Sequence, residues 1–230
     1  MRQKMRSLTL LLSILLAFPF TLSAQSVGEL LKKTTDALSA GEDDYAVSLF
    51  RQSASAGIDQ SEMYYWTSVD KSKNVTPRLA LELANRYKNL RNYDKAYLFY
   101  KEVLQYHPQD VAMLVSCAEM EMMRGQEKNA VKLYESALAL DPNNLQANIF
   151  LGNYYYLQAE QDKKQLDEDY KRIGTPTRMQ YARYRNSLSE VFSSGYTKAR
   201  SYLQKVLQLF PSTEAGKTLD KIKKTETDTH

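Results

Sequence analysis

Cysteine and histidine are scarce in this 230-residue chain. Cys117 is the only cysteine, and His107 and His230 are the only histidines. One thiol cannot build an intramolecular disulfide framework, and it is predicted to be a small buried apolar side chain, with a reactive or intermolecular thiol as the alternative. The chain offers no metal-ligand spacing of Cys and His. Neither histidine stands in a credible arrangement with a nucleophile that it could activate as a base. We therefore predict no catalytic residue, metal ligand or cofactor, and expect a protein that is not an enzyme.

Glycine, long apolar runs and an excess of one charge are also missing. The eight glycines are not clustered, which excludes a glycine-rich phosphate loop. After residue 24 no stretch is apolar enough to span a bilayer. The chain has 31 basic and 27 acidic residues, and three of the basic ones precede residue 25, which leaves 28 against 27. This balance argues against nucleic acid as a partner.

Residues 1–24 are typical of a secretory signal peptide. Arg2, Lys4 and Arg6 precede an apolar run over residues 8–20, and small residues follow at 21–24. The run is too short and wrongly flanked for a spanning helix, although an uncleaved anchor is the alternative. We expect an exported protein, periplasmic or associated with the cell envelope of a bacterium.

One pattern is repeated in residues 77–144 at a distance of 34 residues. A fixed period of this length is typical of stacked helical repeats. Small residues allow two antiparallel helices to cross closely, and a tyrosine beside them fills the remaining space. The expected helices cover about 78–90, 94–106, 111–124 and 127–140. The repeated positions are Ala84, Ala96, Tyr100 and Pro108, which recur as Ala118, Ala130, Tyr134 and Pro142.

Residues 25–76 are predicted to form a divergent first repeat followed by an insertion of about 16 residues with a short extra helix. The insertion contains Tyr64, Tyr65 and Trp66, the last being the only tryptophan. These aromatic side chains either pack against the neighbouring repeat or form an exposed recognition patch, because aromatics supply both buried area and interface anchors.

Residues 145–211 are predicted to form a fourth repeat that is interrupted. Gly152 and Ala199 occupy positions that are 12 residues apart in the other repeats but 47 apart here, so 35 residues are inserted, at about 158–194. Apolar periodicity predicts that the first helix continues to about 172 and that a second helix returns over 178–193. This helical hairpin either packs on the array or forms an arm for a partner or for oligomerisation. Pro211 ends the repeat, and 212–230 form a capping helix and tail.

The hairpin also carries a run of mixed charge. Seven basic residues are interspersed with four acidic ones from Asp162 to Arg185. A solvated helix surface explains such a run, and weak contact with anionic lipid or glycan is the alternative.

The spacing Ala84-x11-Ala96-x3-Tyr100-x7-Pro108 and its 34-residue echo resemble tetratricopeptide (TPR) repeats. The resemblance implies an all-α, right-handed superhelical array of antiparallel helix pairs, here with an inserted helical hairpin. It also implies a concave groove lined by the first helices, unless the insertion covers it. A carboxylate clamp known in this class is not carried over, because Leu81 and Val115 replace its polar residues. The implied groove residues are Arg78, Leu81, Asn85, Lys88, Val115, Glu119, Met122, Met123, Ile149, Asn153 and Tyr156.

These features together indicate a non-enzymatic scaffold for protein–protein interaction. It would bind a peptide segment or a helix of a protein partner through the groove, the hairpin or both. The alternative is a self-assembling structural component of an envelope complex. In that case the aromatic residues of 64–66 and 181–184 would form homotypic contacts.

Overall fold

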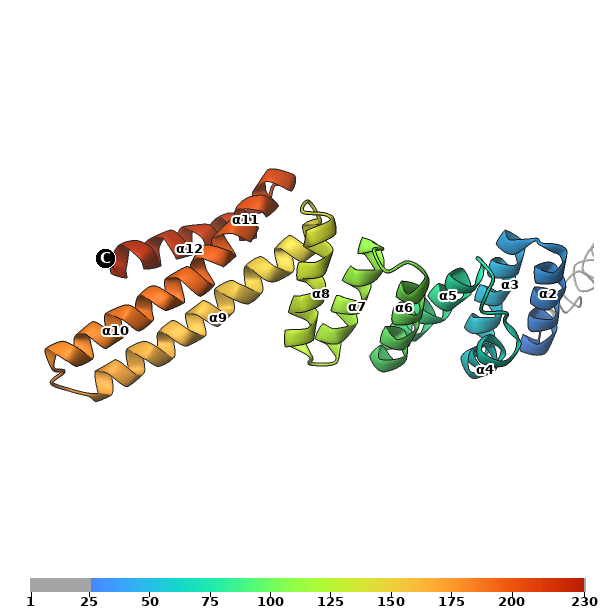
Figure 1. Ribbon diagram of the computed structural model, residues 1–230, viewed down its shortest axis with the longest axis horizontal. Coiled ribbons are helices and arrows are strands. Elements are labelled where there is room, and N and C mark those ends of the chain that lie inside the picture. Colours follow the sequence, from blue (N-terminus) through green and yellow to red (C-terminus); the bar gives the residue numbers. More distant parts are fainter. Residues whose placement is uncertain (1–25, 230) are drawn as a thin grey trace, which may run out of the picture. The chain divides into compact units, whose positions relative to one another are not determined.

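The computed structural model describes residues 26–229, which form helices and turns with no strand in that range (Figure 1). They fall into two compact units that divide after Ser68. The predicted signal peptide, residues 1–24, lies outside the described part of the chain. No helix within the described range has both the length and the hydropathy needed to cross a membrane.

The first unit contains α2 (Val27–Ala40), α3 (Asp43–Ala56) and α4 (Ile58–Ser68). The Ser26 side chain accepts a hydrogen bond from the Glu29 amide and so caps α2, while Gly41 ends the helix with a left-handed φ of 75°. Buried apolar residues of α2 and α3, among them Leu30 and Ala46, join the two helices. Residues 27–56 thus form a packed helix pair.

The second unit begins with two regular pairs, α5 (Thr76–Asn89) with α6 (Tyr93–Tyr106) and α7 (Val111–Met123) with α8 (Glu127–Leu140). Helix α6 packs against α7 and so joins the pairs (Figure 1). The fold predicted from the 34-residue period, an all-α array of TPR-like helix pairs, is confirmed. All four repeated alanines are fully buried, and the two repeated tyrosines are buried beside them: Ala84, Ala96, Ala118, Ala130, Tyr100 and Tyr134.

The turns within these pairs share one backbone conformation. Gly125 has a φ of 73°, and Arg91, which stands 34 residues earlier, has a φ of 58°. The left-handed region favours glycine because a Cβ atom is crowded there. The repeat geometry therefore imposes this conformation on Arg91 even though the side chain disfavours it.

The fourth repeat is built from two unusually long helices. Its first helix, α9, runs without interruption over Leu145–Arg172. The returning chain passes from α10 (Arg178–Val191) through a π-helical turn, η1 (Phe192–Tyr196), into α11 (Thr197–Leu209) without a break. The predicted hairpin is present, but it lengthens both helices of the repeat and is not a separate element (Figure 1). The two helices of the repeat remain paired along their length because the insertion extends both of them.

Small residues hold this long pair together. A Cβ atom on Gly152 would lie 2.8 Å from Leu203 Cδ2, and one on Gly195 would lie 2.6 Å from Ala159 Cβ. Gly195 belongs to η1, whose wider turn adjusts the register between the hairpin and the repeat. The final helix, α12 (Thr213–Thr229), packs on α11 and contributes Ala215 and Ile222 to the shared core.

We expect Ala96→Arg and Ala130→Arg to destabilise the fold by about 3 kcal/mol or more, because each places a charge at a fully buried helix crossing. Denaturant melts of the purified variants measure the free energy of unfolding. Ala139→Arg, at an exposed position of α8, is the control and should change it little. Unchanged melting of the two buried variants would contradict the proposed register.

We expect Gly195→Ala to destabilise the protein by about 1–3 kcal/mol, because the added methyl group overlaps Ala159. Gly216→Ala is the control: its methyl group meets nothing within 4 Å, so the change should be neutral or stabilising. Combining Gly195→Ala with Ala159→Gly should recover part of the loss in thermal melts. Additive effects of the two substitutions would show that this contact does not control packing.

Candidate functional site

The implied groove residues lie on α5, α7 and α9, the first helices of three successive repeats. Residues at equivalent positions are 34 apart and form rows across the three helices, a surface that we call the first-helix face. Arg78, near the start of α5, and Met123, the last residue of α7, also belong to the face. The rows are Leu81, Val115 and Ile149; Asn85, Glu119 and Asn153; and Lys88, Met122 and Tyr156.

The exposed apolar side chains of this face lie on α7 and α9. Val115 is only 7% exposed and belongs to the hydrophobic core, so it holds the helices together and is not offered to a ligand. Met123 is 55% exposed and Ile149 40%. Leu157, which is 64% exposed, was missed from the sequence although it lies one 34-residue step after Met123. Met123, Ile149 and Leu157 are therefore the exposed apolar members of the face.

Most polar groups of the face already have partners within the protein. The Tyr100 hydroxyl donates a hydrogen bond to Asn85 Oδ1 at 2.8 Å, and burial raises the pKa of Tyr100 to about 12, so the phenol remains a donor. Lys88 Nζ lies 2.7 Å from Glu119 Oε2 and links α5 to α7. Both members of that ion pair are partly exposed, so its contribution to stability is modest. These contacts fix the side chains, and Asn153 remains an exposed amide on α9.

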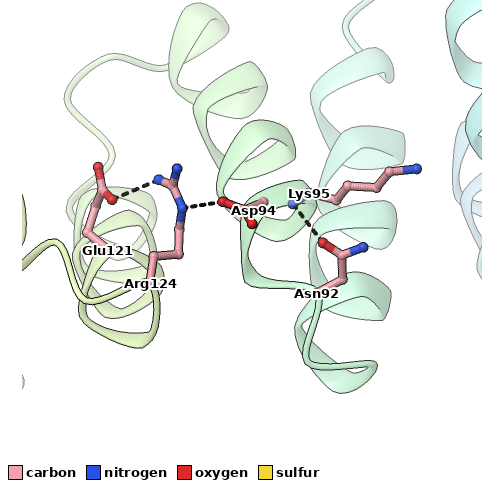
Figure 2. Close-up of polar contacts among 5 residues, drawn as sticks. All are labelled: Asn92, Asp94, Lys95, Glu121 and Arg124. Atoms are coloured by element: carbon pink, nitrogen blue, oxygen red, sulfur yellow. Dashed lines mark hydrogen bonds and ion pairs between the residues drawn. The ribbon is translucent and has the colours of Figure 1, made fainter.

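A second polar cluster joins the turns at one edge of the two regular repeats. Figure 2 shows Arg124, at the end of α7, between Glu121 and Asp94. Arg124 Nε lies 2.6 Å from Asp94 Oδ1, and Nη1 lies 2.7 Å from Glu121 Oε2. Since Glu121 is buried, the guanidinium compensates a carboxylate that has left water. Arg124 therefore acts as a clamp between α6 and α7.

A shallow pocket of about 480 Å³ opens beside this clamp. Asn92 lines it, but the Asn92 side chain accepts a hydrogen bond from the Lys95 amide at 3.2 Å and so caps α6 (Figure 2). The Asp94 and Arg124 side chains bind each other. Leu90 and Met123 supply exposed apolar surface at the rim. The pocket thus continues the Met123 end of the first-helix face.

The aromatic residues of α4 do not form one exposed patch. Tyr65 is fully buried, whereas Trp66 is exposed and meets Tyr65 edge to face at 5.0 Å. Tyr64 is half-buried, and its hydroxyl lies 2.8 Å from Thr35 Oγ1. Consecutive helix residues point in different directions, so three neighbours cannot share one face. Of these three aromatic residues, Trp66 is the one that is exposed.

The aromatic residues of the hairpin are divided in the same way. Tyr170 and Tyr184 stack with ring centroids 4.2 Å apart, and the Tyr184 hydroxyl donates to Asp167 Oδ1 at 2.8 Å. Burial and the neighbouring Asp167 carboxylate raise the pKa of Tyr184 to about 12. Tyr184 therefore fastens α10 to α9, while Tyr181 is exposed.

Cys117 lies fully buried in α7. Burial raises the pKa of its thiol to about 12, so the thiol stays protonated at neutral pH. Because the thiolate is the nucleophilic form, this residue acts in packing, as predicted for a small apolar side chain.

No protein-family model matches the chain, and no curated protein matches its sequence. Two solved TPR proteins are only distantly similar to the chain, with TM-scores below 0.5. A TPR repeats protein from Bacteroides fragilis NCTC 9343 is 15% identical, with a TM-score of 0.49 over 87% of this chain and 99% of that one. A thermophilic TPR protein from Thermus thermophilus is 16% identical, with a TM-score of 0.33 over 86% and 98%.

A much stronger similarity exists to the crystal structure of a candidate protein-binding protein from Bacteroides ovatus ATCC 8483. The two are 58% identical, and the match covers 90% of this chain and 100% of that chain, with a TM-score of 0.82. The chain therefore belongs to the same family of helical-repeat proteins as this Bacteroides ovatus protein.

Proposed function

We propose that the protein is a non-enzymatic scaffold, exported to the cell envelope, that binds a segment of a protein partner on the first-helix face. The observation that carries the proposal is the exposure of Met123, Ile149 and Leu157 on two adjacent first helices. The description of the Bacteroides ovatus relative as a candidate protein-binding protein supports the protein-binding part of this proposal.

The chemistry of this face suits a peptide segment or a helix. Met and Ile side chains offer apolar area without demanding one geometry, and Met adapts to several apolar partners. The exposed Asn153 amide can both donate to and accept from a peptide backbone. Helix pairing and the contacts of Asn85, Lys88 and Glu119 fix the face in advance, which lowers the entropic cost of binding.

Export rests on residues 1–24, where basic residues, an apolar run and small residues follow in the order of a signal peptide. We expect the chain, expressed with its own N-terminus, to accumulate outside the cytoplasm with these residues removed. Cell fractionation and N-terminal sequencing of the mature protein measure this. A full-length chain recovered from the cytoplasm would contradict export, and a full-length chain in the membrane fraction would indicate an uncleaved anchor.

We expect Ile149→Asp combined with Leu157→Asp to reduce capture of envelope proteins at least about tenfold, because two apolar contacts are replaced by charges. The matched control is Leu98→Asp with Leu140→Asp, at second-helix positions that are 49% and 44% exposed, and it should bind normally. Quantitative pull-down from envelope extract measures both. Equal binding by the two variants would refute the first-helix face as the binding surface.

The Ile149→Asp, Leu157→Asp variant also distinguishes a scaffold that binds another protein from a self-assembling component. Sedimentation of the wild-type chain at high concentration tests for oligomers. An oligomer that dissociates in the Ile149→Asp, Leu157→Asp variant would make the partner a second copy of this chain and favour the self-assembling component.

A further inference from the structure

The turn between α9 and α10 forms the end of the hairpin that is remote from α7 and α8 (Figure 1). We call residues 170–185 the hairpin tip. Residues 171–179 of the tip are all exposed. The tip carries five basic residues and no acidic one: Lys171, Arg172, Arg178, Arg183 and Arg185.

Charge is separated along the hairpin. The acidic residues of α9 precede the tip, and most are paired there: Lys163 lies 2.7 Å from Asp167 and Lys164 lies 4.0 Å from Glu168. Arg172 reaches back to Asp169 at 3.2 Å. Arg172 is thus paired with an acidic residue of α9, and the exposed Lys171, Arg178 and Arg183 contribute to the positive excess of the tip.

Exposed apolar side chains lie among these cations. Met179 is 68% exposed, and Ile173 and Tyr181 are exposed as well. Ile173 lies at the end of α9 and Met179 in the first turn of α10, so the two flank the turn. The stacked pair of Tyr170 and Tyr184 holds the two helices together just below. The tip is thus a supported projection with apolar and basic side chains at its end.

We propose that the hairpin tip docks on the surface of an anionic lipid bilayer. Its Lys and Arg side chains would contact lipid phosphates, while Met179, Ile173 and Tyr181 enter the boundary between headgroups and acyl chains. Basic residues interleaved with apolar and aromatic ones are what interfacial segments use.

A bilayer fits this surface better than a protein partner does. A stable protein interface buries roughly 800 Å² on each partner, more than one turn and its flanking residues offer. A bilayer is planar and deformable, and it presents phosphates to a projecting tip in every direction. The surface proposed above for a protein segment, by contrast, lies on α7 and α9 near Ile149.

Co-sedimentation of the full chain with vesicles tests the proposal. We expect binding to vesicles with about a third phosphatidylglycerol, weakening with salt, and none to pure phosphatidylcholine. The variant Lys171→Ser, Arg178→Ser, Arg183→Ser should bind about tenfold or more weakly. The control Lys217→Ser, Lys221→Ser, Lys223→Ser removes the same charge from exposed positions of α12 and should bind within about twofold of wild type.

Two further variants test whether the apolar side chains of the tip contribute beyond its charge, and whether vesicle binding is independent of the first-helix face. Ile173→Ser with Met179→Ser should lower vesicle binding several-fold at unchanged charge, whereas Ile149→Asp with Leu157→Asp should affect it little. Absence of wild-type binding to anionic vesicles, or equal losses in the tip and α12 variants, would overturn the proposal. Retention on polyglutamate without vesicle binding would also overturn it and assign the tip to an acidic protein.

Discussion

Close contact between paired helices at small residues is the constraint on which the rest of the structure depends. In the regular repeats this contact is made by fully buried alanines such as Ala96 and Ala130. In the fourth repeat Gly195 lies directly against Ala159. At such separations any larger side chain would push the helices apart, and a packed interior cannot absorb that displacement. The pairs therefore act as rigid units whose outer residues can vary.

The fourth repeat shows what this constraint permits. A long insertion within a helix pair is tolerated when both helices lengthen together, as α9 and the continuous α10–η1–α11 segment do. The π-helical turn adjusts the register, and Tyr196 anchors it by donating a hydrogen bond to Glu160 Oε1 at 2.8 Å. The insertion therefore extends the repeat into an arm, and the packing of its two helices against each other makes the arm rigid. Its end carries charges and apolar side chains that the repeat itself does not need.

The first-helix face combines ordered polar side chains with exposed apolar ones. Lys88, Glu119 and Asn85 are held by contacts within and between repeats, and Arg124 fixes the adjacent edge by joining α6 to α7. Surfaces of this kind lose little side-chain freedom when a ligand arrives. The exposed apolar residues concentrate on α7 and α9, next to the start of the arm. A partner on this face and a membrane at the hairpin tip would thus engage different parts of one pair of long helices.

The sequence by itself determined the helical-repeat fold and several of the helix boundaries. The expected helices at 94–106 and 127–140 correspond to α6 and α8 within one residue, and α9 ends at the predicted Arg172. Periodicity, caps and turn residues act locally, so they can be read along the chain. Only the tertiary structure decided which side chains are available. Val115 and Tyr65 are buried, Leu157 is exposed, and η1 makes the returning helix continuous, because each depends on neighbours from elsewhere in the fold.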